Sequence, residues 1–157
     1  MSDDPAGQAS VADARAYAYR YLGAREHSCQ ELRDKLLRKG VPRDIAHMAV
    51  DELAEEGLVS DQRYAEAFAR SRIERHQGPF KIRAELRKRG VPDAVVEEAL
   101  SAQEPDWRDL ALSWARKRQR GELDQKEKAR LYRSGCGRGF SHEQMMRVIE
   151  ALESEAP

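Results

Sequence analysis

Basic side chains are the residues of this chain whose types and spacing could do chemistry. They gather in residues 61–90 and 116–138, whose net charges are +5 and +6, while the intervening residues 91–115 sum to −5. The whole chain has 28 basic and 28 acidic residues, so its overall charge identifies no partner. Clustered Arg and Lys side chains attract anionic partners, either nucleic acid or an acidic protein surface.

The candidate binding residues lie in both basic stretches. Those of the first stretch crowd around one predicted turn with Glu74 and Glu85 nearby, and either an anionic partner or a solvated surface explains them. Lys39 and Arg89 differ, because each lies in the last turn of a predicted helix, where a cation complements the helix dipole. The candidate partner-binding residues are Arg70, Arg72, Arg75, Lys81, Arg83, Arg87, Arg116 and Arg120.

Other chemical patterns in the sequence are weak. His27 and Cys29 are close together, but one such pair cannot fill the four positions of a zinc site. The segment GCGRGF, residues 135–140, lacks the preceding strand and the glycine spacing of a nucleotide-binding loop. No motif of an activated nucleophile or of an acid–base pair occurs. We therefore expect no catalytic residue, no cofactor and no metal site.

Aromatic residues could stack on nucleobases, but helix packing also explains them. Trp107 and Trp114 share a predicted helix face with Leu110, which favours a place in the core. Tyr17, Tyr19 and Tyr21 alternate with Arg15 and Arg20, a pattern that fits base stacking. The pair Tyr17 and Tyr21 fits a half-buried helix face equally well.

Helices must position these residues, because the chain repeats a helical unit. The stretch LRDKLLRKGVP at residues 32–42 returns as IRAELRKRGVP at residues 82–92, and a fixed-period echo indicates a repeated supersecondary unit. Aligning Gly139 with Gly90 gives an offset of 49, which extends the repeat to a third unit. Ala, Leu, Glu, Arg and Lys dominate the composition, so we expect little or no sheet.

The first unit shows the plan of three helices. Apolar residues recur at helical spacing from Val11 to a predicted helix end at Gly23. A capping box of Ser28 and Glu31 then begins a short helix that ends at Gly40. Short helices are marginal alone, so three of them must close a small core together.

Further signals come from the third helix and the third unit. Pro42 fits the first turn of a helix whose apolar stripe includes Met48. A capping box of Ser141 and Gln144 begins the last helix. Gly135 stands where the first two units have leucine, so we expect the preceding helix to end early and this unit to be the least stable.

The sequence thus predicts an all-α protein of three tandem three-helix repeats that form an elongated, curved array. The predicted domains are a disordered head at residues 1–9 and repeats at 10–59, 60–104 and 105–154. No run reaches the roughly 18 apolar residues of a membrane span, and the acidic N-terminus lacks the apolar stretch of a secretory leader. Cys29 and Cys136 fit free thiols in a reducing cytoplasm.

Four segments carry a resemblance to a known family. LGAREHSCQELRDKLLRKGV, EEGLVSDQRYAEAFARSR, GPFKIRAELRKRGV and RGFSHEQMMRVIEAL resemble the RecX family of bacterial recombination regulators, from about residue 14 to 152. The resemblance implies a cytoplasmic protein, expected to be a monomer, that binds the RecA recombinase filament on single-stranded DNA. It would modulate, and mostly inhibit, ATP hydrolysis and strand exchange in DNA repair, recombination and the SOS response, without catalysis of its own.

Two other functions stay open at this point. Three-helix units with a basic helix also resemble helix-turn-helix domains, so the chain could be a sequence-tolerant DNA-binding protein. Its zero net charge speaks against that alternative, because phosphate binding usually accompanies a strongly basic domain. A helical scaffold for another protein is the third possibility.

Overall fold

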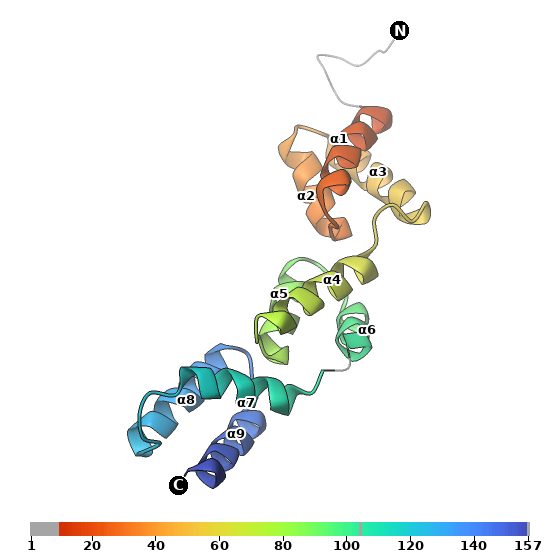
Figure 1. The fold of residues 1–157 in the computed structure, drawn as a ribbon. Helices are drawn as coiled ribbons and strands as arrows, with labels where there is room; N and C mark the ends of the chain where they lie inside the picture. Colours follow the sequence, from red (N-terminus) through yellow and green to blue (C-terminus); the bar gives the residue numbers. More distant parts are fainter. Residues whose placement is uncertain (1–9, 104, 157) are drawn as a thin grey trace. The chain divides into compact units, whose positions relative to one another are not determined.

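Helices are the only regular elements in residues 10–103 and 105–156, which the computed structural model describes (Figure 1). This confirms the predicted all-α fold. In this part of the chain the helices are α1 (Val11–Ala24), α2 (Cys29–Arg38), α3 (Arg43–Glu55), α4 (Asp61–Glu74), α5 (Pro79–Lys88), α6 (Asp93–Gln103), α7 (Trp107–Arg118), α8 (Gln125–Gly137) and α9 (His142–Glu155). None of them is long and apolar enough to cross a membrane.

Helices α1, α2 and α3 pack against one another around an apolar core (Figure 1). Leu32 of α2 and Leu53 of α3 are fully buried in it. Met48 was predicted to join this core, but its side chain is 53% exposed, so that prediction is wrong. The buried stripe of α3 runs through Ala46 and Val50 instead, and Met48 stands about 200° around the helix from Ala46.

The predicted capping boxes are present, one in half and one in full. Ser28 Oγ accepts the Glu31 backbone N–H at 3.1 Å, but the Glu31 carboxylate binds the Arg25 guanidinium at 2.9 Å rather than the cap amide. The second box is complete. The Gln144 N–H donates to Ser141 Oγ at 3.0 Å, and the Ser141 N–H donates to Gln144 Oε1 at 2.7 Å.

Helices α7, α8 and α9 form a second group with a core of their own. Trp114 lies in that core, as predicted, with its ring centroid 6.0 Å from that of Phe140. Trp107 is only half-buried. Ser141 and Asp124 cap α9 and α8, which fixes where these two helices begin.

Gly135 lies inside α8, and the helix continues to Gly137. The prediction that this helix ends early is therefore wrong. A Cβ on Gly135 would come 2.9 Å from Cγ of Met145, so the methionine fills the space that a leucine would need. In the first group of helices, the corresponding positions are held by Leu36 and Ala46, both buried. The first core thus has the larger side chain, Leu36, on α2 and the smaller one, Ala46, on α3, whereas the second core has Gly135 on α8 and the larger Met145 on α9.

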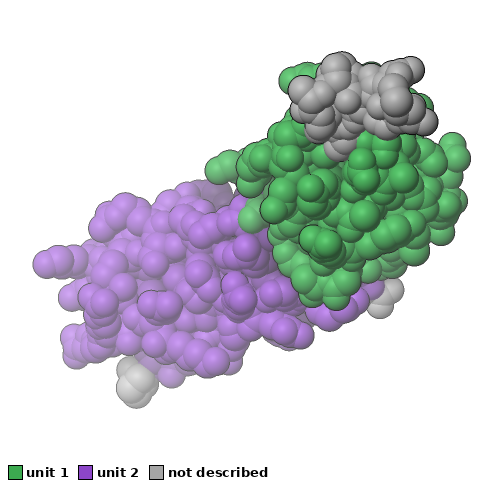
Figure 2. Space-filling view, turned by 90° about the horizontal axis from the view of Figure 1, so that it is seen from above, with its two compact units in different colours: residues 1–67, 87–96 green, residues 68–86, 97–157 purple. Residues whose placement is uncertain are grey.

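The chain divides into two compact units, shown in different colours in Figure 2. One unit comprises residues 1–67 and 87–96, and the other comprises residues 68–86 and 97–157. The division passes through α4, α5 and α6. The repeat boundaries and the elongated, curved array stay predictions, and the predicted head at residues 1–9 lies outside the described residues.

Candidate functional site

Hydrogen bonds join two turns of the chain, and one of these turns lies in the middle of the first basic stretch. The segment between α4 and α5 contacts the turn between α8 and α9, within the second compact unit. The Gly78 N–H donates to the Arg138 carbonyl at 2.9 Å, and the Phe80 N–H donates to the Gly139 carbonyl at 3.0 Å. The turn carbonyls thereby satisfy backbone donors at the start of α5, where a helix leaves its first amides without internal partners.

The side chain of Arg138 completes this joint. Its Nε donates to the His76 carbonyl at 3.1 Å, and its Nη2 donates to the Arg75 carbonyl. His76 adopts the left-handed backbone conformation, with a φ of 59°, which is uncommon outside glycine. Burial lowers the pKa of the His76 imidazole, and the nearby charges of Lys117 and Arg138 lower it further. Cations from two other segments, Lys117 at the end of α7 and Arg138 after α8, therefore act on the His76 imidazole.

Lys81 belongs to the same place in the fold. A Cβ on Gly139 would lie 2.5 Å from Cβ of Lys81, so the start of α5 and the α8–α9 turn touch at this residue. We name this group of side chains the basic joint. Its members are Arg75, His76, Lys81, Lys117 and Arg138.

A similar joint occurs 50 residues earlier, within the first compact unit. Ser28 Oγ donates to the Arg89 carbonyl at 2.8 Å, and a Cβ on Gly90 would lie 2.7 Å from Cβ of Gln30. Gly90 and Gly139 have positive φ values of 80° and 102°. Glycine is therefore favoured at both positions for two reasons. The turn requires a left-handed backbone conformation, and the backbone there lies close to the start of an earlier short helix.

The structure separates the predicted binding residues into paired and unpaired cations. The ion pairs are Arg72 with Glu85 at 3.6 Å, Arg83 with Glu97 at 2.8 Å, Arg87 with Asp93 at 2.8 Å, and Arg116 with Glu155. In the described part of the chain, Arg70, Arg75, Lys81 and Arg120 have no ion pair. Such surface pairs contribute only about 0–1 kcal/mol, so an anionic partner can compete for their cations.

Only some of the predicted residues come together. Arg75 and Lys81 are in the basic joint, and Arg72 lies one turn before it on α4, with its guanidinium 4.5 Å from the ring centroid of Phe68. Arg87 belongs to the first compact unit. The remaining residues lie on the surface of the second unit, Arg70 on α4 and Arg83 on α5, with Arg116 and Arg120 at the end of α7.

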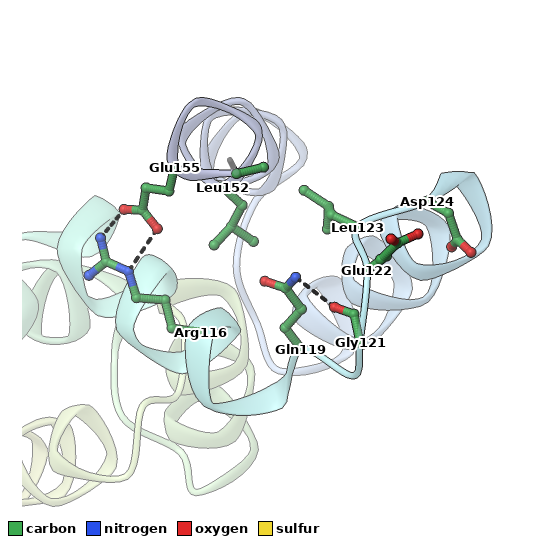
Figure 3. Close-up of a pocket in the computed structure, with 9 residues that line it drawn as sticks. Arg116, Gln119, Gly121, Glu122, Leu123, Asp124, Leu152 and Glu155 are labelled. Atoms are coloured by element: carbon green, nitrogen blue, oxygen red, sulfur yellow. Dashed lines mark hydrogen bonds and ion pairs between the residues drawn. The ribbon is translucent and has the colours of Figure 1, made fainter.

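Arg116 flanks a hollow of about 790 Å³ at the end of α7 (Figure 3). Its guanidinium binds Glu155 at the end of α9, while Leu123 and Leu152 supply apolar walls. Gln119 donates through Nε2 to the Gly121 carbonyl at 3.0 Å across the loop that follows α7. The hollow therefore holds its one arginine in an ion pair and gathers no cluster of cations.

Arg120 acts through its backbone. Its N–H donates to Glu127 Oε2 at 2.6 Å, and the Arg130 guanidinium binds the same carboxylate at 2.7 Å. The Arg130 hydrogen bond, followed by the one from the Arg120 amide, lowers the pKa of Glu127 to about 2. The Arg120 guanidinium itself is exposed and unpaired within the described residues.

The sequence prediction missed three members of the basic joint. Arg138 precedes Gly139 as Arg89 precedes Gly90, so the repeat alignment contains a signal for it. Lys117 lies in the second basic stretch, but nothing in its spacing connects it with His76.

Comparison with known proteins identifies the family. The profile described as the first three-helix domain of RecX matches residues 14–53, and the one for the second three-helix domain matches residues 60–100. The regulatory protein RecX of Halorhodospira halophila is 40% identical over 158 residues, which cover 99% of this chain and 96% of that protein. The one of Chromohalobacter salexigens is 46% identical over 140 residues, covering 88% and 91%.

Solved structures show the same fold. The crystal structure of RecX from Lactobacillus salivarius matches with a TM-score of 0.81 at 23% identity, over 91% of this chain and 96% of that one. Another structure, described as regulatory protein RecX, matches with a TM-score of 0.76 at 24% identity, over 89% of this chain and 73% of that one. On the strength of the sequence matches, this chain belongs to the RecX family of regulatory proteins.

Proposed function

We propose that this chain regulates DNA repair and recombination by binding the RecA recombinase filament on single-stranded DNA. Binding lowers the ATP hydrolysis and strand exchange of the filament. The chain acts in the cytoplasm as a monomer, and it has no catalytic activity of its own. Membership of a regulatory family supports the role, and the basic joint supports the choice of an anionic partner.

The basic joint is suited to an anionic partner for two reasons. Arg75 and Lys81 have no ion pair within the described chain, so no internal bond must break before they bind. The Arg138 guanidinium holds the backbone of Arg75, and the carbonyls of the α8–α9 turn hold the start of α5 next to Lys81, which limits the conformational entropy lost on binding. A filament on single-stranded DNA presents phosphates, and opposite charge accelerates association with such a surface.

We also propose that the chain is an array of three tandem repeats with boundaries near residues 59 and 104. The two joints that follow one another at a spacing of 50 residues support this proposal. An array places equivalent turns at regular intervals along its length. That arrangement suits a filament, whose own surface repeats at regular intervals.

A recombinase ATPase assay on single-stranded DNA tests the proposed function. Titrating in the wild-type chain should lower ATP hydrolysis at fewer than one chain per recombinase subunit. The Arg75→Glu/Lys81→Glu protein should need at least about tenfold more chain for the same inhibition, because a tenfold change corresponds to roughly 1.4 kcal/mol of lost interaction.

The matched control is the Arg20→Glu/Arg43→Glu protein. Both of its arginines are exposed and lie in the first compact unit, and the change in net charge is the same. The control should inhibit as the wild type does. Equal loss in both variants would show that only net charge matters, and undiminished inhibition by the Arg75→Glu/Lys81→Glu protein would remove the basic joint from the interface.

A further inference from the structure

Phe80 is the most exposed large apolar side chain in the described part of the chain, with 57% of its surface accessible. Burying such an apolar ring stabilises a folded chain, so its exposure here forgoes a gain in stability. The joint itself does not need an aromatic residue here. At the corresponding position of the joint 50 residues earlier stands Gln30.

The ring of Phe80 is held on a fixed backbone. Its N–H donates to the Gly139 carbonyl at 3.0 Å, and the N–H of Ile82, two residues further on, donates to the Gly78 carbonyl at 3.3 Å. The carbonyls of Arg75 and His76 accept hydrogen bonds from the Arg138 guanidinium. An exposed aromatic ring on a fixed backbone loses little entropy when a flat partner stacks on it.

One cation lies against this ring, and others belong to the segments next to it. The guanidinium carbon of Arg83 lies 5.8 Å from the ring centroid, and Lys81 is the next residue along α5. The basic joint adds Arg75 and Arg138 from the two segments that meet beside Phe80. Three acidic residues are near this group: Glu97 pairs with Arg83 at 2.8 Å, Glu85 pairs with Arg72 at 3.6 Å, and Glu74 directly precedes Arg75 in the sequence. Positive charge therefore exceeds negative charge around the ring.

We propose that Phe80 stacks on an unpaired nucleobase while Lys81 and the basic joint bind the adjoining phosphates, so that the chain contacts single-stranded DNA directly. Proteins that bind single strands without sequence preference combine an aromatic platform with a basic groove in this way. The bases of a duplex are already stacked on one another, so the platform selects single strands. This inference rests on the proposed function, because the recombinase filament supplies the single-stranded DNA that Phe80 would contact.

Binding of the full chain to two labelled strands, without recombinase, tests this inference by fluorescence anisotropy. One strand is oligo-thymidine, and the other has the same length and phosphates but abasic sugars. Phe80→Ala should weaken binding to oligo-thymidine about 5- to 150-fold, the usual effect of removing one stacking side chain, and should leave binding to the abasic strand within about twofold. Phe80→Trp should keep the wild-type affinity, and oligo-thymidine should quench the fluorescence of the added indole.

Two further variants isolate the stacking contribution. Lys81→Gln removes only a phosphate contact, so it should weaken binding to both strands by the same factor and reduce the salt dependence of binding. Met146→Ala removes another exposed apolar side chain of the same compact unit, 42% accessible, and should change neither affinity.

Three results would overturn the inference. They are wild-type binding that does not distinguish the two strands, a Phe80→Ala protein as tight as wild type on oligo-thymidine, and a Phe80→Ala protein equally weakened on both strands. If Phe80→Ala instead spares oligo-thymidine and weakens binding to DNA-free recombinase, the ring contacts protein and not a base. Each of these outcomes leaves the ATPase test of the proposed function standing, since that assay follows filament inhibition and not binding to the bare strand.

Discussion

Substituting Gly78 by alanine should open the joint that carries the proposed interface. The φ of Gly78 lies outside the left-handed region, so alanine meets no backbone strain there. Its Cβ, however, would overlap the backbone of Gly139 and Phe140, which cannot move aside as a flexible side chain can. The cost of the substitution is therefore a measure of the joint alone.

The magnitude follows from the bonds that hold this joint. Separating the two backbones breaks the hydrogen bonds Gly78 to Arg138, at 2.9 Å, and Phe80 to Gly139, at 3.0 Å. Each contributes about 1 kcal/mol, and opening the joint also weakens the two hydrogen bonds that the Arg138 side chain donates to the carbonyls of Arg75 and His76. We expect Gly78→Ala to lower the free energy of unfolding by about 2–4 kcal/mol.

Gly40→Ala provides the comparison. Gly40 is the turn glycine that precedes α3, with a φ of 88°, and a Cβ on it would meet nothing within 4 Å. Its substitution costs about 1–2 kcal/mol of left-handed strain, less about 0.4–1 kcal/mol from the stiffer unfolded chain. The expected net loss is about 1 kcal/mol.

Urea unfolding followed by far-UV circular dichroism measures both losses. The Gly78→Ala protein should unfold at a urea concentration about 1 M below that of the Gly40→Ala protein, for a slope of about 2 kcal/mol per molar. Hydrogen exchange of the Phe80 amide should accelerate in the Gly78→Ala protein and stay unchanged in the Gly40→Ala protein. Equal urea midpoints, or a Phe80 amide as protected as in the wild type, would refute the reasoning from the joint.

Three other experiments test the packing of α8 against α9 and the titration of two buried side chains, His27 and Glu127. Burial lowers the pKa of His27 below 6.5, so the free energy of unfolding should fall as the pH drops from 6.5 toward the pKa of the folded protein. His27→Gln should flatten this pH dependence in urea midpoints measured between about pH 8 and 5. A pH dependence as steep as that of the wild type would show that His27 is not its cause. The pKa of Glu127 is lowered from 4.5 to about 2, so its contribution is present above pH 4.5 and lost as the pH falls through 2. Glu127→Gln should therefore lower the melting temperature at about pH 7 but not below pH 2, and equal shifts at both would argue against the carboxylate. Gly135→Leu alone should lower the free energy of unfolding by about 1–3 kcal/mol, whereas adding Met145→Ala should recover most of that loss. Additive free energies in this double-mutant cycle would show that Met145 does not fill the space of the missing leucine.

Local signals in the sequence predicted the helices well. The turn glycines, the Ser141 and Gln144 capping box, and the apolar spacing around Ala14 and Ala18 depend on residues within a few positions of each other. The backbone hydrogen bonds of a helix join residues four positions apart, so nearby residues determine where a helix begins and ends. Met48 was misplaced because a neighbouring stripe of similar spacing, through Ala46, also fits the apolar pattern.

Contacts between distant segments were not predictable in the same way. Nothing near Gly135 announces that Met145 compensates for it, because the complementary volume comes from another helix. The ion pairs of Arg83 with Glu97 and of Arg116 with Glu155 likewise join residues 14 and 39 positions apart. The sequence could therefore identify a basic surface, but it could not say which of its cations are already paired.

The joint at Arg138 makes the order of one segment depend on residues more than sixty positions later in the chain. A fragment that stops after α6 keeps every residue from Arg75 to Lys81 but loses the carbonyls and the guanidinium that hold them. Such a fragment should lose the proposed affinity for the recombinase filament even if its remaining helices fold. Transfer of this surface to another scaffold must therefore include both segments, residues 75–81 and the turn at Arg138 and Gly139 that holds them.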